Sequence, residues 1–194
     1  MKNLPTTSND ILTCARSLII AGGYNGFSYA DIAEVVGIRK ASIHHHFPSK
    51  VDLVRTLVAQ YREEAQAGLE NIELHVSDAL EQLRRYAGYW EACIADASAP
   101  ICVCALLASQ LPLLPEEVAI EVRAHFQYLS TWLSSVLDRG SQLGQLQLRN
   151  TPHAEAEAFM AAIHGAMLTA RAYGDPNKFS FVTGPLLERL ALPL

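Results

Sequence analysis

The spacing of apolar residues is the feature that most constrains this chain, because they recur every three to four positions along most of its length. That period places them on one face of an α-helix. The alternation of apolar and polar residues that half-buried strands require is nearly absent. Residues 9–21 illustrate the pattern, since Ile11, Leu12, Ala15, Leu18 and Ile19 share one face. We therefore predict an all-α fold of about nine helices.

Capping residues, glycines and prolines mark where these helices begin and end. Thr7 with Asp10, Ser28 with Asp31, and Ser49 with Asp52 have the spacing of capping boxes. Glycine at 22–23 and at 37 is expected to end the first two helices, and proline at 48 the third. A long fourth helix is expected to begin at Ser49. Five further helices are expected near residues 76–96, 101–110, 115–140, 152–173 and 176–191.

Residues 28–53 read SYADIAEVVGIRKASIHHHFPSKVDL, two short helices with a glycine turn between them and a longer helix after them. This segment resembles the helix-turn-helix of the TetR family of transcriptional regulators. The residues that carry the resemblance are Ser28, Ile32, Ala33, Gly37, Ile38, Ser42, Ile43, His46, Phe47, Lys50 and Leu53. Two positions depart from the family pattern: His44 stands where a tyrosine is common, and Ala41 where glycine or proline is common.

The resemblance implies a helix-turn-helix DNA-binding domain over residues 1–54 and a larger ligand-sensing and dimerisation domain over residues 55–194. The charge distribution agrees with this division. Residues 1–55 carry six lysines and arginines against four acidic residues, although the whole chain has a net charge of -5. A basic head on an acidic body suits a protein in which only the head contacts phosphate.

The second of the two short helices is expected to read DNA. Arg39, Lys40 and His45 face outward and are predicted to contact base edges in the major groove. Five other residues are predicted to contact phosphate: Ser28, Tyr29, Ser42, His44 and Lys50. The partner is then a double-stranded DNA operator. A solvated basic surface is the alternative interpretation of Arg39 and Lys40.

A small-molecule effector is the second partner that the resemblance implies. Its pocket would combine apolar walls with a few polar groups. The candidates at helical spacing are Tyr86, Trp90 and Cys93, then His125, Tyr128 and Trp132, then His164, Met167 and Leu168, and Cys102 is a further candidate. Ordinary packing in the core is the competing interpretation of each.

Cys102 and Cys104 follow a proline at an expected helix start, where the helix dipole favours thiolate. These cysteines support an alternative function, in which the protein senses oxidants or electrophiles. The simpler interpretation is that both cysteines are buried and unreactive. Two residues apart on a helix, they would point to opposite sides, so a disulfide between them is not expected.

The expected helix at 152–173 is rich in small residues, which allow close approach of a second helix. They are Ala154, Ala158, Ala161, Ala162, Gly165 and Ala166. With the last helix, this one resembles the four-helix dimer interface of the family, which implies a homodimer. Packing within one chain is the alternative. A break or a kink is expected at Gly184-Pro185 in the last helix.

Other function classes lack a supporting pattern. There is no signal peptide and no apolar run of about 18 residues, so we expect a cytoplasmic protein with no membrane partner. The four cysteines contain no CxxC pair, and the consecutive histidines 44–46 point about 100° apart on a helix, so no metal site and no cofactor is expected. The sequence shows no pattern of a nucleophile with a neighbouring base, so we do not expect an enzyme. The prediction is a ligand-responsive repressor, although a DNA-binding activator would carry the same motif.

Overall fold

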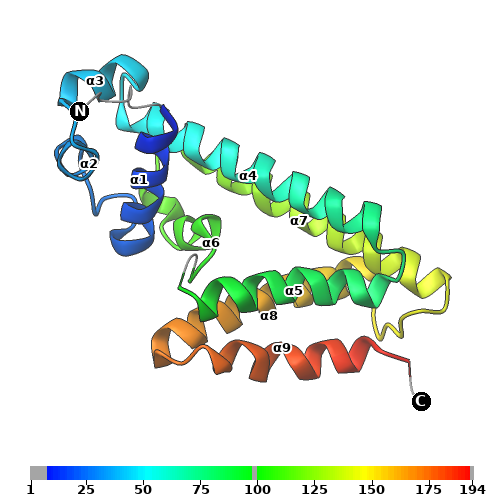
Figure 1. Cartoon of the computed structure of the whole chain (residues 1–194). Coiled ribbons are helices and arrows are strands. Elements are labelled where there is room, and N and C mark those ends of the chain that lie inside the picture. Colours follow the sequence, from blue (N-terminus) through cyan, green and yellow to red (C-terminus); the bar gives the residue numbers. More distant parts are fainter. Residues whose placement is uncertain (1–7, 98–99, 193–194) are drawn as a thin grey trace. The chain divides into compact units, whose positions relative to one another are not determined.

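The computed structural model of this protein describes residues 8–97 and 100–192. Within them the chain is all-α, as predicted, with nine α-helices and one short 3-10 helix (Figure 1). The helices are α1 (Ser8–Gly22), α2 (Tyr29–Val36), α3 (Lys40–His46), α4 (Lys50–His75), α5 (Ala79–Ala95), α6 (Val103–Ala108), the 3-10 turn η1 (Leu111–Leu113), α7 (Glu116–Gln142), α8 (Pro152–Tyr173) and α9 (Asn177–Leu190). None of the described helices is long and apolar enough to span a membrane.

Three details differ from the sequence expectations or fall outside the description. The capping box expected of Thr7 lies outside the described residues. Helix α6 begins only at Val103, so Cys102 precedes it. Of the two distortions expected at Pro185, the break is wrong, because α9 continues through this residue, and the kink stays a prediction. Pro185 has no backbone N–H, so the carbonyl of Phe181 lacks the hydrogen bond that it would accept in a regular helix. Both residues are exposed, so water can donate to that carbonyl instead.

The chain forms two compact units, and α4 and α7 contribute residues to both. The first unit combines residues 8–63 with residues 103–125, which contain α6, η1 and the start of α7. In it α1 packs on α2 and on α6, and α2 packs on α3. Its core contains the fully buried side chains of Ile11, Ile19, Ile32, Ile43 and Leu53.

A glycine joins the loop after α1 to the segment after α6 within this unit. Gly23 has a φ of 73°, and the amide of Gln110 lies directly against it. The Gln110 Oε1 atom accepts a hydrogen bond of 2.9 Å from the backbone N–H of Tyr24. Glycine is required here both for the left-handed backbone and for the close approach.

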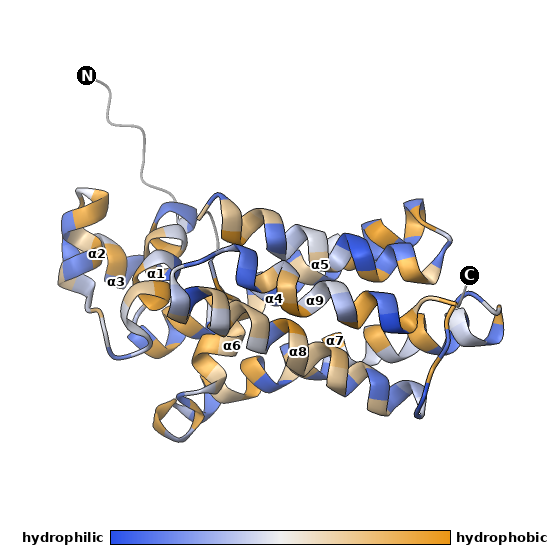
Figure 2. Ribbon diagram, turned by 90° about the horizontal axis from the view of Figure 1, so that it is seen from below, coloured by the Kyte–Doolittle hydropathy of each residue, from blue (hydrophilic) through white to orange (hydrophobic). Residues whose placement is uncertain are grey.

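The second unit combines residues 64–97 and 100–102 with residues 126–192. In it α8 packs on α9, and both contact α5. Figure 2 shows hydrophobic and hydrophilic residues interleaved along these helices, as amphipathic helices require. The largest fully buried side chains of this unit are Leu83, Ile101, Leu133, Leu137, Phe159 and Phe179.

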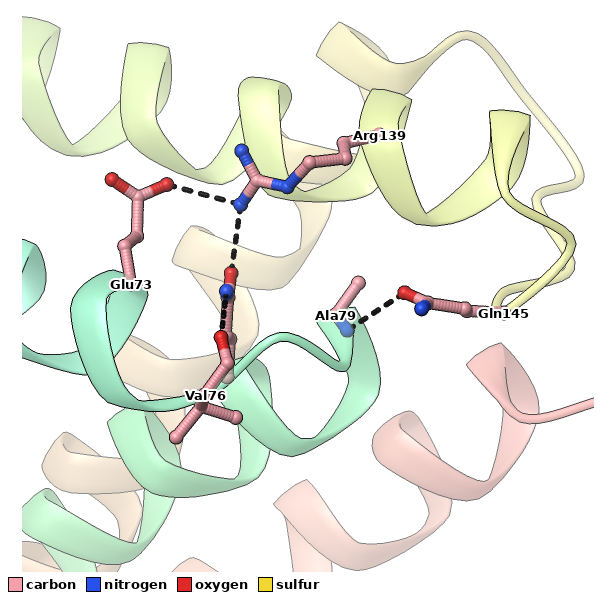
Figure 3. A network of polar contacts seen from close by, with 6 residues as sticks. Glu73, Val76, Ala79, Arg139 and Gln145 are labelled. Carbon is pink, nitrogen blue, oxygen red and sulfur yellow. Dashed lines mark hydrogen bonds and ion pairs between the residues drawn. The ribbon is translucent and has the colours of Figure 1, made fainter.

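Polar contacts join the ends of α4, α5 and α7 in the second unit (Figure 3). The Arg139 Nη2 atom donates to Glu73 Oε1 at 3.0 Å and to Gln82 Oε1 at 2.9 Å. Gln82 Nε2 donates in turn to the Val76 carbonyl. Because Gln82 is almost fully buried, satisfying both ends of its amide avoids the cost of an unpaired buried polar group.

Candidate functional site

Helix α2 begins at a complete capping box. The Ser28 hydroxyl accepts from the Ala30 N–H at 3.2 Å, and Asp31 Oδ2 accepts from the Ser28 N–H at 2.6 Å. The Ser28 hydroxyl also donates to that carboxylate at 2.8 Å. These hydrogen bonds hold the pKa of Asp31 below its usual value. At its other end, α2 stops at Gly37, whose φ of 75° allows the tight turn into α3.

Two buried side chains fix the orientation of α3. Ile43 is fully buried and Phe47 is nearly so. On the rest of the helix Lys40 and Ser42 are exposed, and so is Arg39, the extended residue that precedes the helix. His44, His45 and His46 are exposed as well. The residues predicted to meet base edges are therefore all exposed, on or directly before a short helix that its buried side chains anchor.

Lys50, the first residue of α4, is held in position by the loop before α2. Its ammonium donates to the Phe27 carbonyl and lies over two aromatic rings, 4.1 Å from the centre of Phe27 and 5.0 Å from that of Tyr24. Partial burial lowers the pKa of Lys50, while the nearby Asp31 carboxylate opposes that change. The cation is thus fixed at the first turn of a long helix, where backbone N–H groups also favour an anion.

An open hollow in the surface of the first unit gathers several of these groups, with a volume of about 480 Å³. It is lined by Phe27, Ser28, Tyr29, Ala30, Lys40, His44 and Lys50. The Tyr29 ring lies 4.8 Å from that of His44, and its hydroxyl donates to the Phe47 carbonyl at 2.9 Å. Burial raises the pKa of Tyr29 to about 12. Tyr29 therefore lines the hollow as an uncharged side chain, and its hydroxyl proton is already used in the hydrogen bond to the Phe47 carbonyl.

Two lysines, a histidine and a serine thus converge on a hollow at the start of a long helix, beside a short helix with exposed basic residues. Charged and neutral donors of this kind bind phosphate oxygens, and an exposed helix anchored on its inner side fits the major groove of DNA. The fold and the site define a helix-turn-helix DNA-binding protein.

Comparison with known proteins identifies the family. Residues 11–57 match the bacterial regulatory proteins of the tetR family. A TetR-family transcriptional regulator from Agrobacterium tumefaciens has 64% sequence identity and a TM-score of 0.94, over 95% of this chain and 97% of the other. This protein belongs to the TetR family of transcriptional regulators. No curated protein sequence matches the chain.

Two further structures are similar along almost the whole chain. A TetR regulator from Legionella pneumophila has 28% identity and a TM-score of 0.86, over 97% of this chain and 99% of its own. The regulator FadR from Bacillus subtilis, solved in complex with stearoyl-CoA, has 17% identity and a TM-score of 0.73, over 97% of this chain and all of its own. At that identity FadR shows only that the fold is shared.

The second unit brings together several of the residues predicted to line an effector pocket. The Tyr86 ring lies 5.8 Å from that of Trp132 and 6.4 Å from that of Phe159. Burial raises the pKa of Tyr86, and the neighbouring Cys102 adds to this, while the Trp90 indole acts in the opposite direction. Tyr86, Trp90, Trp132 and Cys102 therefore lie in one region of the unit.

Three buried nitrogen atoms in this unit lack a hydrogen-bond partner among the described residues. They are Nε1 of Trp90, Nε1 of Trp132 and Nε2 of His164. The His164 ring lies 5.3 Å from that of Phe126. An unpaired polar atom in a buried position costs about 1–3 kcal/mol, so a ligand or water that met these nitrogen atoms would gain from them.

The other predicted pocket residues have varied positions. Met167 is fully buried in α8, and Cys93 is half-buried on α5. Partial burial raises the pKa of Tyr128, with the carboxylates of Glu70 and Glu73 adding to this. His125 lies in the first unit, with its ring 5.5 Å from that of Tyr61.

Sequence reasoning did not find the residues that support this site. Tyr24 and Phe27 hold the Lys50 ammonium, and Gln110 holds the backbone of Tyr24. For Tyr24 and Phe27, the sequence offered one signal, which is that both are aromatic residues in the loop before the helix-turn-helix. Gln110 lies 86 positions from Tyr24 and has no signal in the sequence.

Proposed function

We propose that this protein represses transcription by binding a palindromic operator as a homodimer, and that a small molecule releases it. The observation that carries the proposal is the anchored α3 helix beside the hollow that contains Lys50. In this proposal Arg39, Lys40 and His45 contact base edges. Ser28, Ser42, His44 and Lys50 contact phosphate, with Tyr29 positioning the wall behind them. No catalytic step is required, and the protein acts in the cytoplasm, where bacterial DNA is found.

The exposed face of α8 supports a homodimer. Ala154, Ala158, Ala161 and Gly165 are exposed at spacings of three and four residues, as one helical face requires, while Ala166 is buried within its own unit. Leu168 continues that face with an exposed fraction of 54%. Small residues beside an exposed leucine suit the close packing of a second helix. Two heads in a dimer would occupy successive major grooves.

The unpaired nitrogen atoms of the second unit support an effector with hydrogen-bond acceptors on an apolar or aromatic body. Two indole N–H groups can donate to its carbonyl or carboxylate oxygens, while Tyr86 and Phe159 supply apolar contact. FadR shows that a protein of this fold can hold a small molecule with an acyl chain. An effector releases DNA only to the extent that it binds the released conformation more tightly.

A second candidate is a thiol sensor. Cys102 is buried beside Tyr86, and Cys104 is buried with its sulfur within 4.8 Å of a His125 nitrogen. An imidazole beside a thiol can accept its proton and so favour the reactive thiolate. Oxidative release of DNA that Cys102→Ser or Cys104→Ser abolishes would support this candidate over a reversible effector.

Fluorescence anisotropy on duplexes selected from random DNA tests the DNA-binding proposal. We expect Lys50→Gln to weaken binding to all duplexes and to reduce the slope of log affinity against log salt by about 0.9, because one phosphate contact is lost. Lys40→Ala should relax base preference at one position of each half-site, by about 1–3 kcal/mol.

The matched control is Lys178→Gln, which removes a cation from α9 in the second unit. It should leave both the affinity and the salt slope unchanged. Selection that yields no preferred duplex, with a folded protein, would refute the proposal.

The effector is sought by screening aromatic and aliphatic carbonyl compounds for a rise in Tm and for release of the selected duplex. We expect Trp132→Phe, which retains a ring and removes the N–H, to weaken the effect of active compounds by about 5- to 10-fold, the value of one hydrogen bond. Compounds that act equally on both proteins would contradict the assignment of Trp132.

A further inference from the structure

His44 lines the hollow of the first unit, and a hydrogen bond to the backbone orients its ring. The Nδ1 atom of His44 lies 3.2 Å from the carbonyl oxygen of Pro48, four residues later. A carbonyl oxygen can only accept a hydrogen bond, so the proton of the neutral imidazole must be on Nδ1. The Nε2 atom of the neutral ring then carries a lone pair and can only accept.

A lone pair on Nε2 does not suit a phosphate. Phosphate oxygen atoms accept hydrogen bonds, so a neutral His44 with its proton on Nδ1 has no donor to offer them. Protonation changes this, because both nitrogen atoms of an imidazolium donate. Nδ1 can then keep its hydrogen bond to the Pro48 carbonyl while Nε2 donates to phosphate. Histidine is the residue type whose charge normally changes between about pH 5 and pH 8.

The charges around the hollow leave a place for an anion. The titratable groups on the elements packed around His44 are Lys40, His45 and His46 on α3, Tyr29 and Asp31 on α2, and Lys50 and Asp52 on α4. Both lysines line the hollow, whereas no carboxylate does among the residues that the structure describes there. The two carboxylates each accept a hydrogen bond from a serine hydroxyl. A phosphate bound in the hollow would be the anion that balances a third positive charge.

We propose that His44 contacts a DNA phosphate only as an imidazolium, so that each DNA-binding head takes up a proton when it binds. This inference deepens the proposed repressor function and rests on it. The hollow then has two lysine cations and a third cation that depends on pH. Because the protonated form of His44 is the one that binds phosphate, affinity for DNA should rise as the pH falls.

Fluorescence anisotropy at pH 6 and pH 8 on one selected duplex tests the proposal. The full-length protein is compared with His44→Gln, whose amide can donate to phosphate at either pH. Between pH 8 and pH 6, we expect the affinity of the protein to rise more than that of His44→Gln, by about 10-fold for each head, the value of a hydrogen bond to a charged group. The slope of log affinity against log salt should also steepen by about 0.9 for each head, and only where His44 is present.

Calorimetry in buffers with different enthalpies of ionisation counts the protons that are taken up on binding. Near pH 7, the protein should take up more protons than His44→Gln, by up to about one for each head. A merely structural role for His44 would change the affinity equally at both pH values and would leave the proton count unchanged. Circular dichroism should show that the variant is folded, since His44 is exposed.

His75→Gln is the matched control. His75 is an exposed residue of α4 in the second unit, and its Nδ1 atom lies 2.8 Å from the Asn71 carbonyl oxygen. It therefore has the same tautomer as His44 at a place remote in sequence from the hollow. Its replacement should leave the pH dependence, the salt slope and the proton count unchanged. NMR of the ring nitrogen atoms in the free protein at pH 8 should show the proton of both histidines on Nδ1.

Three results would overturn the inference. They are a proton on Nε2 of His44 in the free protein at pH 8, equal changes with pH in the protein and in His44→Gln, and a pH dependence that survives in His44→Gln but is lost in Lys50→Gln. DNA binding without any effect of His44 on its pH dependence would refute this inference alone. The absence of a preferred duplex at either pH would refute the proposed function, and this inference with it.

Discussion

Replacing Gly23 by alanine tests the contact between the loop after α1 and the segment after α6. A Cβ atom at Gly23 would lie 2.2 Å from Nε2, 2.7 Å from Oε1 and 2.8 Å from Cδ of Gln110. These separations are shorter than van der Waals contact allows, so the amide must move away. The hydrogen bond of 2.9 Å from the Tyr24 N–H is then lost.

Two contributions set the size of the effect. A left-handed backbone costs an alanine about 1–2 kcal/mol relative to glycine. Loss of the hydrogen bond to Tyr24 adds about 0.5–1.5 kcal/mol. Gly37→Ala is the matched control, because Gly37 has a φ of 75° and no neighbouring atom within 4 Å of its Cβ position. It should lose only the first contribution, so the two variants should differ in free energy of unfolding by about 0.5–1.5 kcal/mol.

Urea unfolding, followed by circular dichroism at one protein concentration, measures these free energies. A double-mutant cycle with Gln110→Ala isolates the contact. Gln110→Ala should cost about 0.5–1.5 kcal/mol in the unaltered protein and almost nothing once Gly23 is alanine. Equal losses in the two glycine variants, or additive effects in the cycle, would refute the reasoning.

Two further predictions concern carboxylates. Glu155 is buried, and its Oε1 atom accepts from two backbone N–H groups and its Oε2 atom from Arg189 at 2.9 Å. Glu155→Ala should lower the free energy of unfolding by about 3–5 kcal/mol in urea titration. Glu116→Ala, which removes an exposed ion pair, should cost under about 1 kcal/mol, and equal losses would contradict this account. Hydrogen bonds with Ser28 lower the pKa of Asp31 in the folded protein below its usual value of 3.8. The ionised Asp31 side chain therefore stabilises the fold above pH 3.8, and this stabilisation is lost as the pH falls below that value. The Tm difference between the protein and Asp31→Asn, measured by calorimetry, should therefore shrink below about pH 4, and a difference that grows on acidification would refute the argument.

The sequence predicts local features of this fold more fully than contacts between distant segments. Helix α8 begins and ends at the predicted residues, because Thr151 caps its start, Pro152 stands at its first position and Gly174 ends it. The exposure of Arg39 and Lys40 follows from the helical phase that the apolar Ile43 and Phe47 set. Helix α6 is shorter than predicted, since Pro100 allows a helix to start but does not require one at the next residue.

Contacts across long separations could not be predicted from one sequence. Lys50 meets the ring and carbonyl of Phe27, 23 positions earlier, only because the α2 and α3 helices return the chain to that place. The pairing of Cys104 with His125 depends in the same way on how α6 packs with α7. Periodicity places each residue on a face of its own helix, and packing decides which faces meet.

The first compact unit is built from two stretches of chain, residues 8–63 and 103–125, and this has a consequence for exchange between regulators. Recombination that joins only the N-terminal stretch to a foreign sensor would leave behind α6 and Gln110, which contact α1 and the Tyr24 backbone. A chimera that preserves the stability and DNA specificity of the head must therefore transfer both stretches together. Evolution by simple fusion of a head gene to a sensor gene is correspondingly restricted in a chain of this topology.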